Sequence, residues 1–110
     1  MLYTELKAGE KEYKLRMTTR AVVALEKQLG CNPISIFSNE EELPTVTAMV
    51  QILHAALQQY EHGITLNDAF DIFDKWLADG HTAIEFVPVI IDIYKVSGLI
   101  AGDAKADEKN

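Results

Sequence analysis

This chain of 110 residues is poor in cysteine, which forms disulfides. It also has no closely spaced histidines, which form many metal sites. Cys31 is the single cysteine, so no disulfide can form within the chain and the fold needs no oxidising compartment. Two histidines that bind one ion from a helix need a spacing of about three or four residues. Those of this chain are His54, His62 and His81, and the sequence therefore predicts no metal site.

Recognisable catalytic motifs are also missing. The six glycines are scattered along the chain, so none of them belongs to a glycine-rich loop that could bind phosphate. Cys31 has no histidine near it in sequence that would activate it as a nucleophile. The closeness of His81 and Glu85 is not enough to make an acid–base pair. We therefore expect a protein that is not an enzyme and has no catalytic residue and no cofactor.

A long apolar run and an excess of positive charge are the next two absences. The longest uncharged apolar run, 86–91, ends at Asp92 and is far shorter than the ~18 residues of a membrane-spanning helix. The first residues do not resemble a signal peptide. Seventeen acidic against ten basic residues give a net charge of −7, which repels phosphate and anionic lipid. We expect a soluble cytoplasmic protein that binds neither nucleic acid nor membranes.

Apolar residues are present in an ordinary proportion, and the first of them follow the period of β-strands. Hydrophobic residues make up 48% of the chain and charged residues 25%, as in globular proteins. Apolar and polar side chains alternate in 2–7 and 12–17, on either side of Gly9, which predicts a β-hairpin at about 2–17 with one buried face. Because an isolated hairpin is only marginally stable, we expect that face to pack on the following helices.

Helical periodicity follows the hairpin and gives the fold class. Apolar spacing and start and stop signals predict helices at about 19–29, 33–38, 45–61, 66–79 and 83–97. The expected capping residues are Thr18 or Thr19, Asn32, Thr45, Thr65 and Thr82, and the expected terminating glycines are Gly30, Gly63 and Gly80. The predicted fold is α+β, predominantly α: an N-terminal β-hairpin followed by about four to five helices in a small bundle. It forms a single globular domain, 1–101, with a flexible polar tail, 102–110.

The last predicted helix carries more apolar surface than the others. Thr82 and Glu85 have the spacing of a capping box, and Pro88 predicts either a kink or a helix that truly begins there. The run 86–96 is apolar on nearly every side, which a domain of this size has difficulty covering. We therefore expect a partner or self-association surface that includes Trp76, Phe86, Val89, Ile90, Ile93, Tyr94 and Leu99. The alternative is that these residues simply fill the core.

Acidic residues gather on the fourth predicted helix. Asp68, Asp71 and Asp74 share roughly one face of it. A calcium loop needs irregular backbone and a turn glycine that this helix lacks. The face is therefore either a solvated surface or, together with the acidic loop 40–42, a docking surface for a basic partner.

The segment 12–30 (EYKLRMTTRAVVALEKQLG) and the turn 32–37 (NPISIF) carry a resemblance to a known family. They are similar to the tail assembly chaperones of long-tailed, siphovirus-like phages and prophages, whose hairpin often ends in such a YKLR-TTRA run. In that family a helix reading LEKxLG and a short NPxxIF turn follow. The resemblance is strongest over residues 3–40, rests on structural motifs, and is only architectural from 45 to 100.

This resemblance implies a function. Proteins of the family bind the long, helix-rich tape measure protein in the host cytoplasm, keep it soluble until tail tube subunits polymerise around it, and are generally absent from the mature virion. The expected partner is thus the tape measure protein, with the tail tube protein as a further candidate, and the apolar surface predicts a homo-oligomer. In many of these phages a ribosomal frameshift appends a second domain to some copies. The alternative function is an acidic adaptor or inhibitor of a basic partner.

Overall fold

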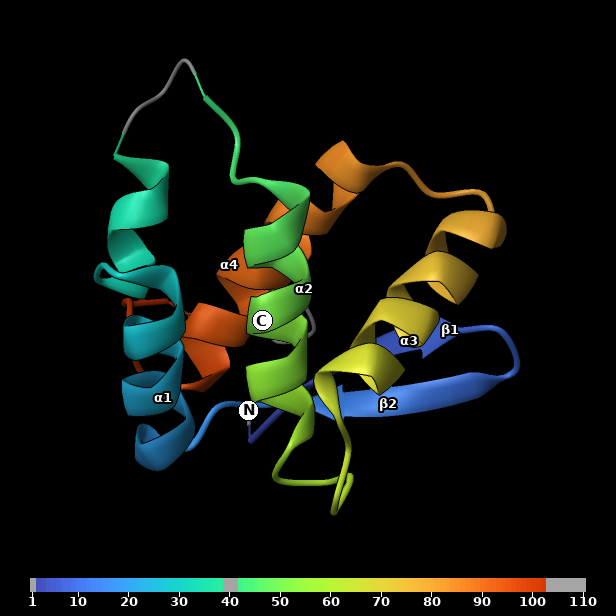
Figure 1. Cartoon of the computed structure of the whole chain (residues 1–110), viewed down its shortest axis with the longest axis horizontal. Coiled ribbons are helices and arrows are strands. Elements are labelled where there is room, and N and C mark those ends of the chain that lie inside the picture. Colours follow the sequence, from blue (N-terminus) through green and yellow to red (C-terminus); the bar gives the residue numbers. More distant parts are fainter. Residues whose placement is uncertain (1, 39–41, 103–110) are drawn as a thin grey trace.

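A two-stranded antiparallel hairpin opens the fold, and most of the remaining chain is helical (Figure 1). The computed structural model describes residues 2–38 and 42–102. In chain order its elements are β1 (Thr4–Ala8), β2 (Lys11–Leu15), α1 (Thr19–Leu29), the 3-10 helix η1 (Pro33–Phe37), α2 (Val46–Leu57), α3 (Leu66–Ala78), the 3-10 helix η2 (Ala83–Glu85) and α4 (Phe86–Val96). The predicted fold class, α+β and predominantly α, is confirmed.

The hairpin has one buried face, as its alternation predicts. Leu6 pairs with Tyr13 across the two strands, and these two side chains are buried together with Leu15. Gly9 takes the positive φ of +66° that the tight turn requires, and its N–H donates to Oδ2 of Asp79 at 2.8 Å. This bond fixes the tip of the hairpin to the end of α3, while the buried face packs on α2, α3 and α4.

Helix α2 is the centre of the molecule. It stands between α1 and α3, and α4 crosses behind it (Figure 1). Eight of its twelve residues are buried: Ala48, Met49, Val50, Ile52, Leu53, Ala55, Ala56 and Leu57. The expectation of a single apolar stripe was therefore too narrow for α2, because neighbouring elements cover it on nearly every side.

Most of the predicted helix starts are confirmed. The capping side chains accept a hydrogen bond from a backbone N–H of the first turn, as for Thr18 from Ala21, Asn32 from Ile34, Thr45 from Ala48 and Thr65 from Asp68. Gly30 ends α1 in the left-handed conformation. The short helix predicted at 33–38 is present as the 3-10 helix η1, whereas the predicted end of the third helix was wrong, because α2 ends at Leu57, well before Gly63.

The start of α4 contradicts one of the alternatives that Pro88 suggested, a helix that begins at the proline. The helix begins at Phe86, after a 3-10 turn, and runs without a break to Val96. Pro88 is thus the third residue of α4, where a backbone N–H would have no partner within the helix, so proline is tolerated. The predicted capping box is wrong, because Thr82 makes no side-chain cap bond; Glu85 instead contacts His81.

Two further predictions concern the ends and loops of the chain. Of the predicted polar tail, 102–110, residues 103–110 lie outside the described residues, as do residues 40 and 41 of the acidic loop.

In the described part of the chain, no helix has the length and apolar character that crossing a bilayer requires.

One buried hydroxyl joins two distant parts of the fold. Tyr94 of α4 is fully buried, and its hydroxyl donates to the carbonyl oxygen of Pro33 at 2.9 Å. Burial raises the pKa of this hydroxyl above its ordinary value, with the neighbouring Cys31 as the smaller cause, so Tyr94 remains a donor at neutral pH. The bond holds η1 against α4.

We expect Tyr94→Phe to lower the free energy of unfolding by about 1–2 kcal/mol, because it leaves the Pro33 carbonyl without its buried donor. Urea denaturation followed by circular dichroism measures this change. Tyr60→Phe is the matched control, since Tyr60 contacts Tyr3 through its ring edge and its hydroxyl has no protein partner among the described residues. Equal stability of Tyr94→Phe and the wild type would contradict the prediction.

Candidate protein-binding surface

The surface predicted from the apolar run is mostly core. Trp76, Phe86, Ile90, Ile93 and Tyr94 are buried within the chain itself, whereas Val89 and Leu99 are only half-buried. The reason is that α4 lies behind α2, and the rings of Trp76 and Phe86 pack on each other with centroids 5.4 Å apart. Five of the seven residues therefore cannot contact a partner unless the domain opens.

The histidines have structural surroundings. His54 places Nε2 3.1 Å from the carbonyl oxygen of Ile64, which ties α2 to the loop before α3. His81 stacks on Trp76 with ring centroids 4.4 Å apart and lies 3.0 Å from Oε1 of Glu85. Within residues 2–38 and 42–102, no three His, Cys, Asp or Glu side chains gather closely enough to hold a metal ion. These contacts hold loops in place and assemble no reactive centre.

The acidic face of α3 is smaller than the sequence suggested. Asp68 belongs to the helix cap: its Oδ2 accepts the backbone N–H of Thr65 at 2.9 Å, while its own N–H donates to the Thr65 hydroxyl. These bonds from Thr65 lower the pKa of Asp68 below 3.8. Asp71 and Asp74 remain exposed beside Phe70, which is 41% exposed. An acidic partner surface would therefore rest on Asp71 and Asp74.

A polar hollow lies between the hairpin, the loop after α2 and α3. It measures about 330 Å³ and is lined by side chains of both signs, among them Lys11, Glu61, Asp71 and Lys75. Lys11 lies 3.2 Å from Glu61 and 4.9 Å from the ring centroid of Tyr13. Because opposite charges already meet across this hollow, it offers a charged ligand little net attraction.

An apolar groove lies at the other side of α2, where α1 ends and α2 begins. It measures about 380 Å³ and is lined by Gln28, Leu29, Cys31, Ile36, Leu43, Pro44, Thr45, Thr47, Ala48 and Gln51. Leu43 is 55% exposed at its edge, and the Cys31 thiol is also exposed. Gln28, Leu29 and Ile36 of this lining belong to the LEKQLG and NPISIF segments, so the residues behind the family resemblance form part of the groove, while six of its ten residues come from 43–51.

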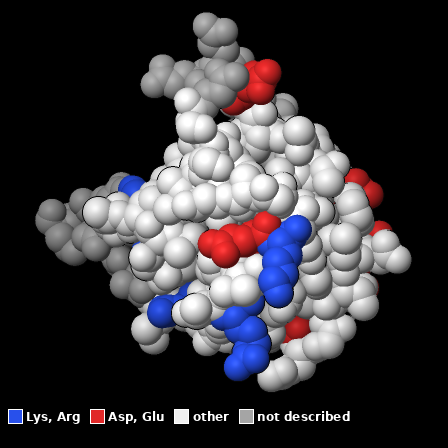
Figure 2. Space-filling model, turned by 60° about the vertical axis from the view of Figure 1, so that its left-hand side comes forward, with Lys and Arg blue, Asp and Glu red and all other residues white. Residues whose placement is uncertain are grey.

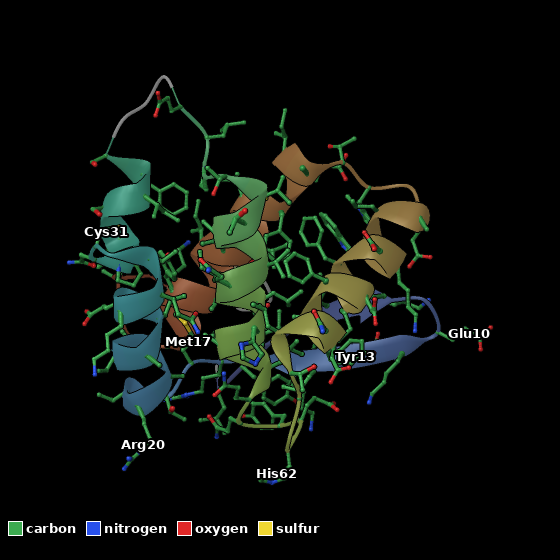
Figure 3. All side chains as sticks on the ribbon, viewed as in Figure 1. Glu10, Tyr13, Met17, Arg20, Cys31 and His62 are labelled. Carbon is green, nitrogen blue, oxygen red and sulfur yellow. The ribbon has the colours of Figure 1, made fainter. Side chains whose placement is uncertain are left out.

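The outer face of α1 continues from this groove. Arg20, Val23, Ala24 and Lys27 line a shallow hollow of about 470 Å³ on it. Arg20, near the start of α1, extends away from the core, and Cys31 lies just beyond the other end of this helix (Figure 3). On the molecular face that brings α1 forward, lysine and arginine side chains gather over the lower half, and most of the surface is uncharged (Figure 2).

Sequence reasoning missed this surface because it searched for the longest apolar run. That run is the part of a chain most strongly driven into its own core. The usable signal was the i, i+3, i+4, i+7 spacing of Arg20, Val23, Ala24 and Lys27, which puts small apolar residues between two cations on one helical stripe.

Comparison with known proteins connects the chain to a family without a known activity. Residues 3–110 match a family described as "Family of unknown function (DUF6096)". No curated protein and no solved structure matches the chain. The family match covers nearly the whole chain and assigns no activity to any residue.

We expect Asp68→Asn to reduce stability in a pH-dependent way, because asparagine keeps the shape of the side chain and removes its charge. Since the folded-state pKa of Asp68 is lowered, the charged cap stabilises the fold above pH 3.8, and this contribution disappears as the pH falls through the folded-state value. The melting temperatures of wild type and variant should differ at pH 7 and converge in acid. Asp71→Asn, outside the cap, is the control; a difference independent of pH would refute the role of the charge.

Proposed function

The chain belongs to this family of unknown function, and we propose that it is a phage tail assembly chaperone that binds the tape measure protein and keeps it soluble for tail tube assembly. It would act in the cytoplasm of the host cell and be left out of the mature virion. The tail tube protein is a further candidate partner. The proposal includes a homo-oligomer, whose contacts must lie outside the five buried residues of the surface first expected.

The observation that carries the proposal is the open apolar groove between α1, η1 and α2. Its lining includes Leu29, Ile36 and Leu43, side chains suited to the apolar stripe of a client helix. Four of its ten lining residues, Gln28, Leu29, Cys31 and Ile36, come from the part of the chain in which the resemblance to tail assembly chaperones is strongest. The tape measure proteins of that family are long and helix-rich, which suits a groove of this kind.

Surface charge supports the same role. A chaperone must stay soluble while it exposes apolar residues, and a net charge far from zero opposes its own aggregation. The chain carries a net charge of −7 together with exposed Leu43 and Val23. A large net charge and exposed apolar residues are compatible with a protein that holds an aggregation-prone client.

An acidic adaptor or inhibitor of a basic partner is the second candidate. Asp71 and Asp74 are exposed on α3, on the side of α2 away from the groove (Figure 1). Binding there would weaken steeply with added salt, whereas apolar binding in the groove would not. Client affinity measured at several salt concentrations, for the wild type and for Asp71→Asn, therefore distinguishes the chaperone from the acidic adaptor.

We expect co-expression with this chain to keep the tape measure protein of the same phage or prophage in the soluble fraction. Leu43→Asp should reduce that soluble fraction at least severalfold, because it puts a charge at the apolar groove where the client packs. Leu43 is exposed, so the variant should fold. Ile84→Asp, at a similarly exposed side chain of the same size in η2, is the matched control. A tape measure protein that stays equally insoluble with the wild-type chain would refute the proposal.

The single cysteine offers an independent measurement on the same groove. Cys31 is exposed and lines the groove, so a bound client should slow its reaction with a maleimide reagent. We expect the labelling rate to fall severalfold in the complex, measured by intact mass spectrometry. An unchanged labelling rate in a complex that forms and stays soluble would place the client elsewhere.

A further inference from the structure

We propose that the outer face of α1, lined by Arg20, Val23, Ala24 and Lys27, binds an amphipathic helix whose apolar stripe is flanked by acidic residues. The proposal deepens the proposed function, on which it rests for the source of that helix, a segment of the client. The binding chemistry itself follows from the side chains of α1 and can be tested without the client.

The four residues form one stripe along the helix. They lie at i, i+3, i+4 and i+7, positions that face the same direction on an α-helix. Val23 is 44% exposed, and Ala24 beside it is exposed as well. The small side chain of Ala24 allows close approach of a second helix, and Val23 gives it an apolar contact between the two cations.

The charges at the two ends of the stripe have no ion-pair partner within residues 2–38 and 42–102 that the structure describes. Arg20 and Lys27 are both exposed; on the face that brings α1 forward, Lys and Arg side chains lie over the lower half, with an acidic side chain beside one of them (Figure 2). The chain as a whole is strongly acidic. At 0.1 M salt, charges beyond about 10 Å are largely screened, so a ligand on α1 responds mainly to these local cations and not to the net charge.

The stripe is continuous with the apolar groove. Gln28 lines the groove and lies one turn beyond Ala24 on α1, and Cys31, which follows the end of α1, lines the groove as well. The distance from Arg20 to Leu29, the last residue of α1, is roughly 14 Å at about 1.5 Å per residue. A helix of about three turns could thus lie along α1 with its end in the groove, where Leu29 and Ile36 provide further apolar contact.

The pattern fits an acidic helix better than a phosphate backbone. Nucleic-acid surfaces need a dense set of Lys and Arg to displace counterions, whereas α1 has only two cations on this stripe and Glu26 next to Lys27. An apolar centre between two separated charges instead matches a helix with apolar positions at i, i+3 and i+4 and carboxylates at the flanks.

The test uses two designed fluorescein-labelled peptides of fourteen residues, with the same leucine stripe flanked by glutamate in one and by lysine in the other. Fluorescence anisotropy gives their dissociation constants for the full chain. We expect tighter binding of the glutamate peptide. The double variant Arg20→Glu/Lys27→Glu should bind that peptide roughly fivefold to thirtyfold more weakly and should prefer the lysine peptide. Val23→Asp should weaken binding of both peptides.

Lys75→Glu is the control for charge reversal, because it makes at an exposed site on α3 the change that each half of the double variant makes, and it should leave both affinities within about twofold. A double variant that keeps the wild-type preference would overturn the proposal, as would an equal effect of Lys75→Glu. Sedimentation velocity tests whether a second copy of the chain binds α1 instead. If the wild-type chain forms an oligomer, the double variant is a monomer and peptide affinity is unchanged, a second copy occupies α1 and the proposal is wrong. Peptide binding as expected with an insoluble tape measure protein would leave this inference standing and refute only the proposed function.

Discussion

Burial of one central helix determines how the whole chain is arranged. Two-thirds of α2 is buried, so the other elements have to cover it from several directions, and α1, α3, α4 and β2 all contact it. The backbone also takes part, since the N–H of Arg16 donates to the carbonyl oxygen of Ala56 at 3.0 Å. Each covering helix then keeps only its outer face for solvent, which decides where a partner can bind.

Local signals in the sequence predicted the elements well because their physics is local. Alternation predicted the hairpin, and Thr18, Thr45 and Thr65 predicted helix starts, since a cap satisfies N–H groups only a few residues away. The wrong predictions concern helix limits, which depend on contacts with other elements of the fold. Pro88 was tolerated because α4 begins at Phe86 and the proline lies in its first turn, and α2 ended at Leu57 although the apolar spacing continued to Tyr60. Spacing alone does not show where neighbouring elements stop covering a helix.

The predicted surface failed for a related reason. The predicted partner surface included Trp76, Phe86 and Tyr94 because a small domain should have difficulty burying so many apolar side chains. The hairpin, however, covers part of α3 and α4, and aromatic contacts such as that of Phe73 with Phe86, 5.2 Å between centroids, close the core. Only exposure distinguishes a core stripe from a binding stripe, and exposure depends on the tertiary arrangement. In this chain the strongly apolar run was therefore a poor guide to exposed surface, because most of it is buried in the core.

The residues at the edge of the groove, which would contact a partner, differ from the buried residues that stabilise the fold. The floor of the groove includes Ala48 and the first turn of α2, which the buried core holds in place, while Leu43 at its edge, like Gln28 and Cys31, is exposed and carries little of the folding free energy. These edge residues can therefore change with the partner while the core keeps the groove in shape. Because the supporting backbone belongs to the most buried helix, a partner would find the groove already formed, and affinity would depend on the chemistry of the edge with little cost for ordering the chain.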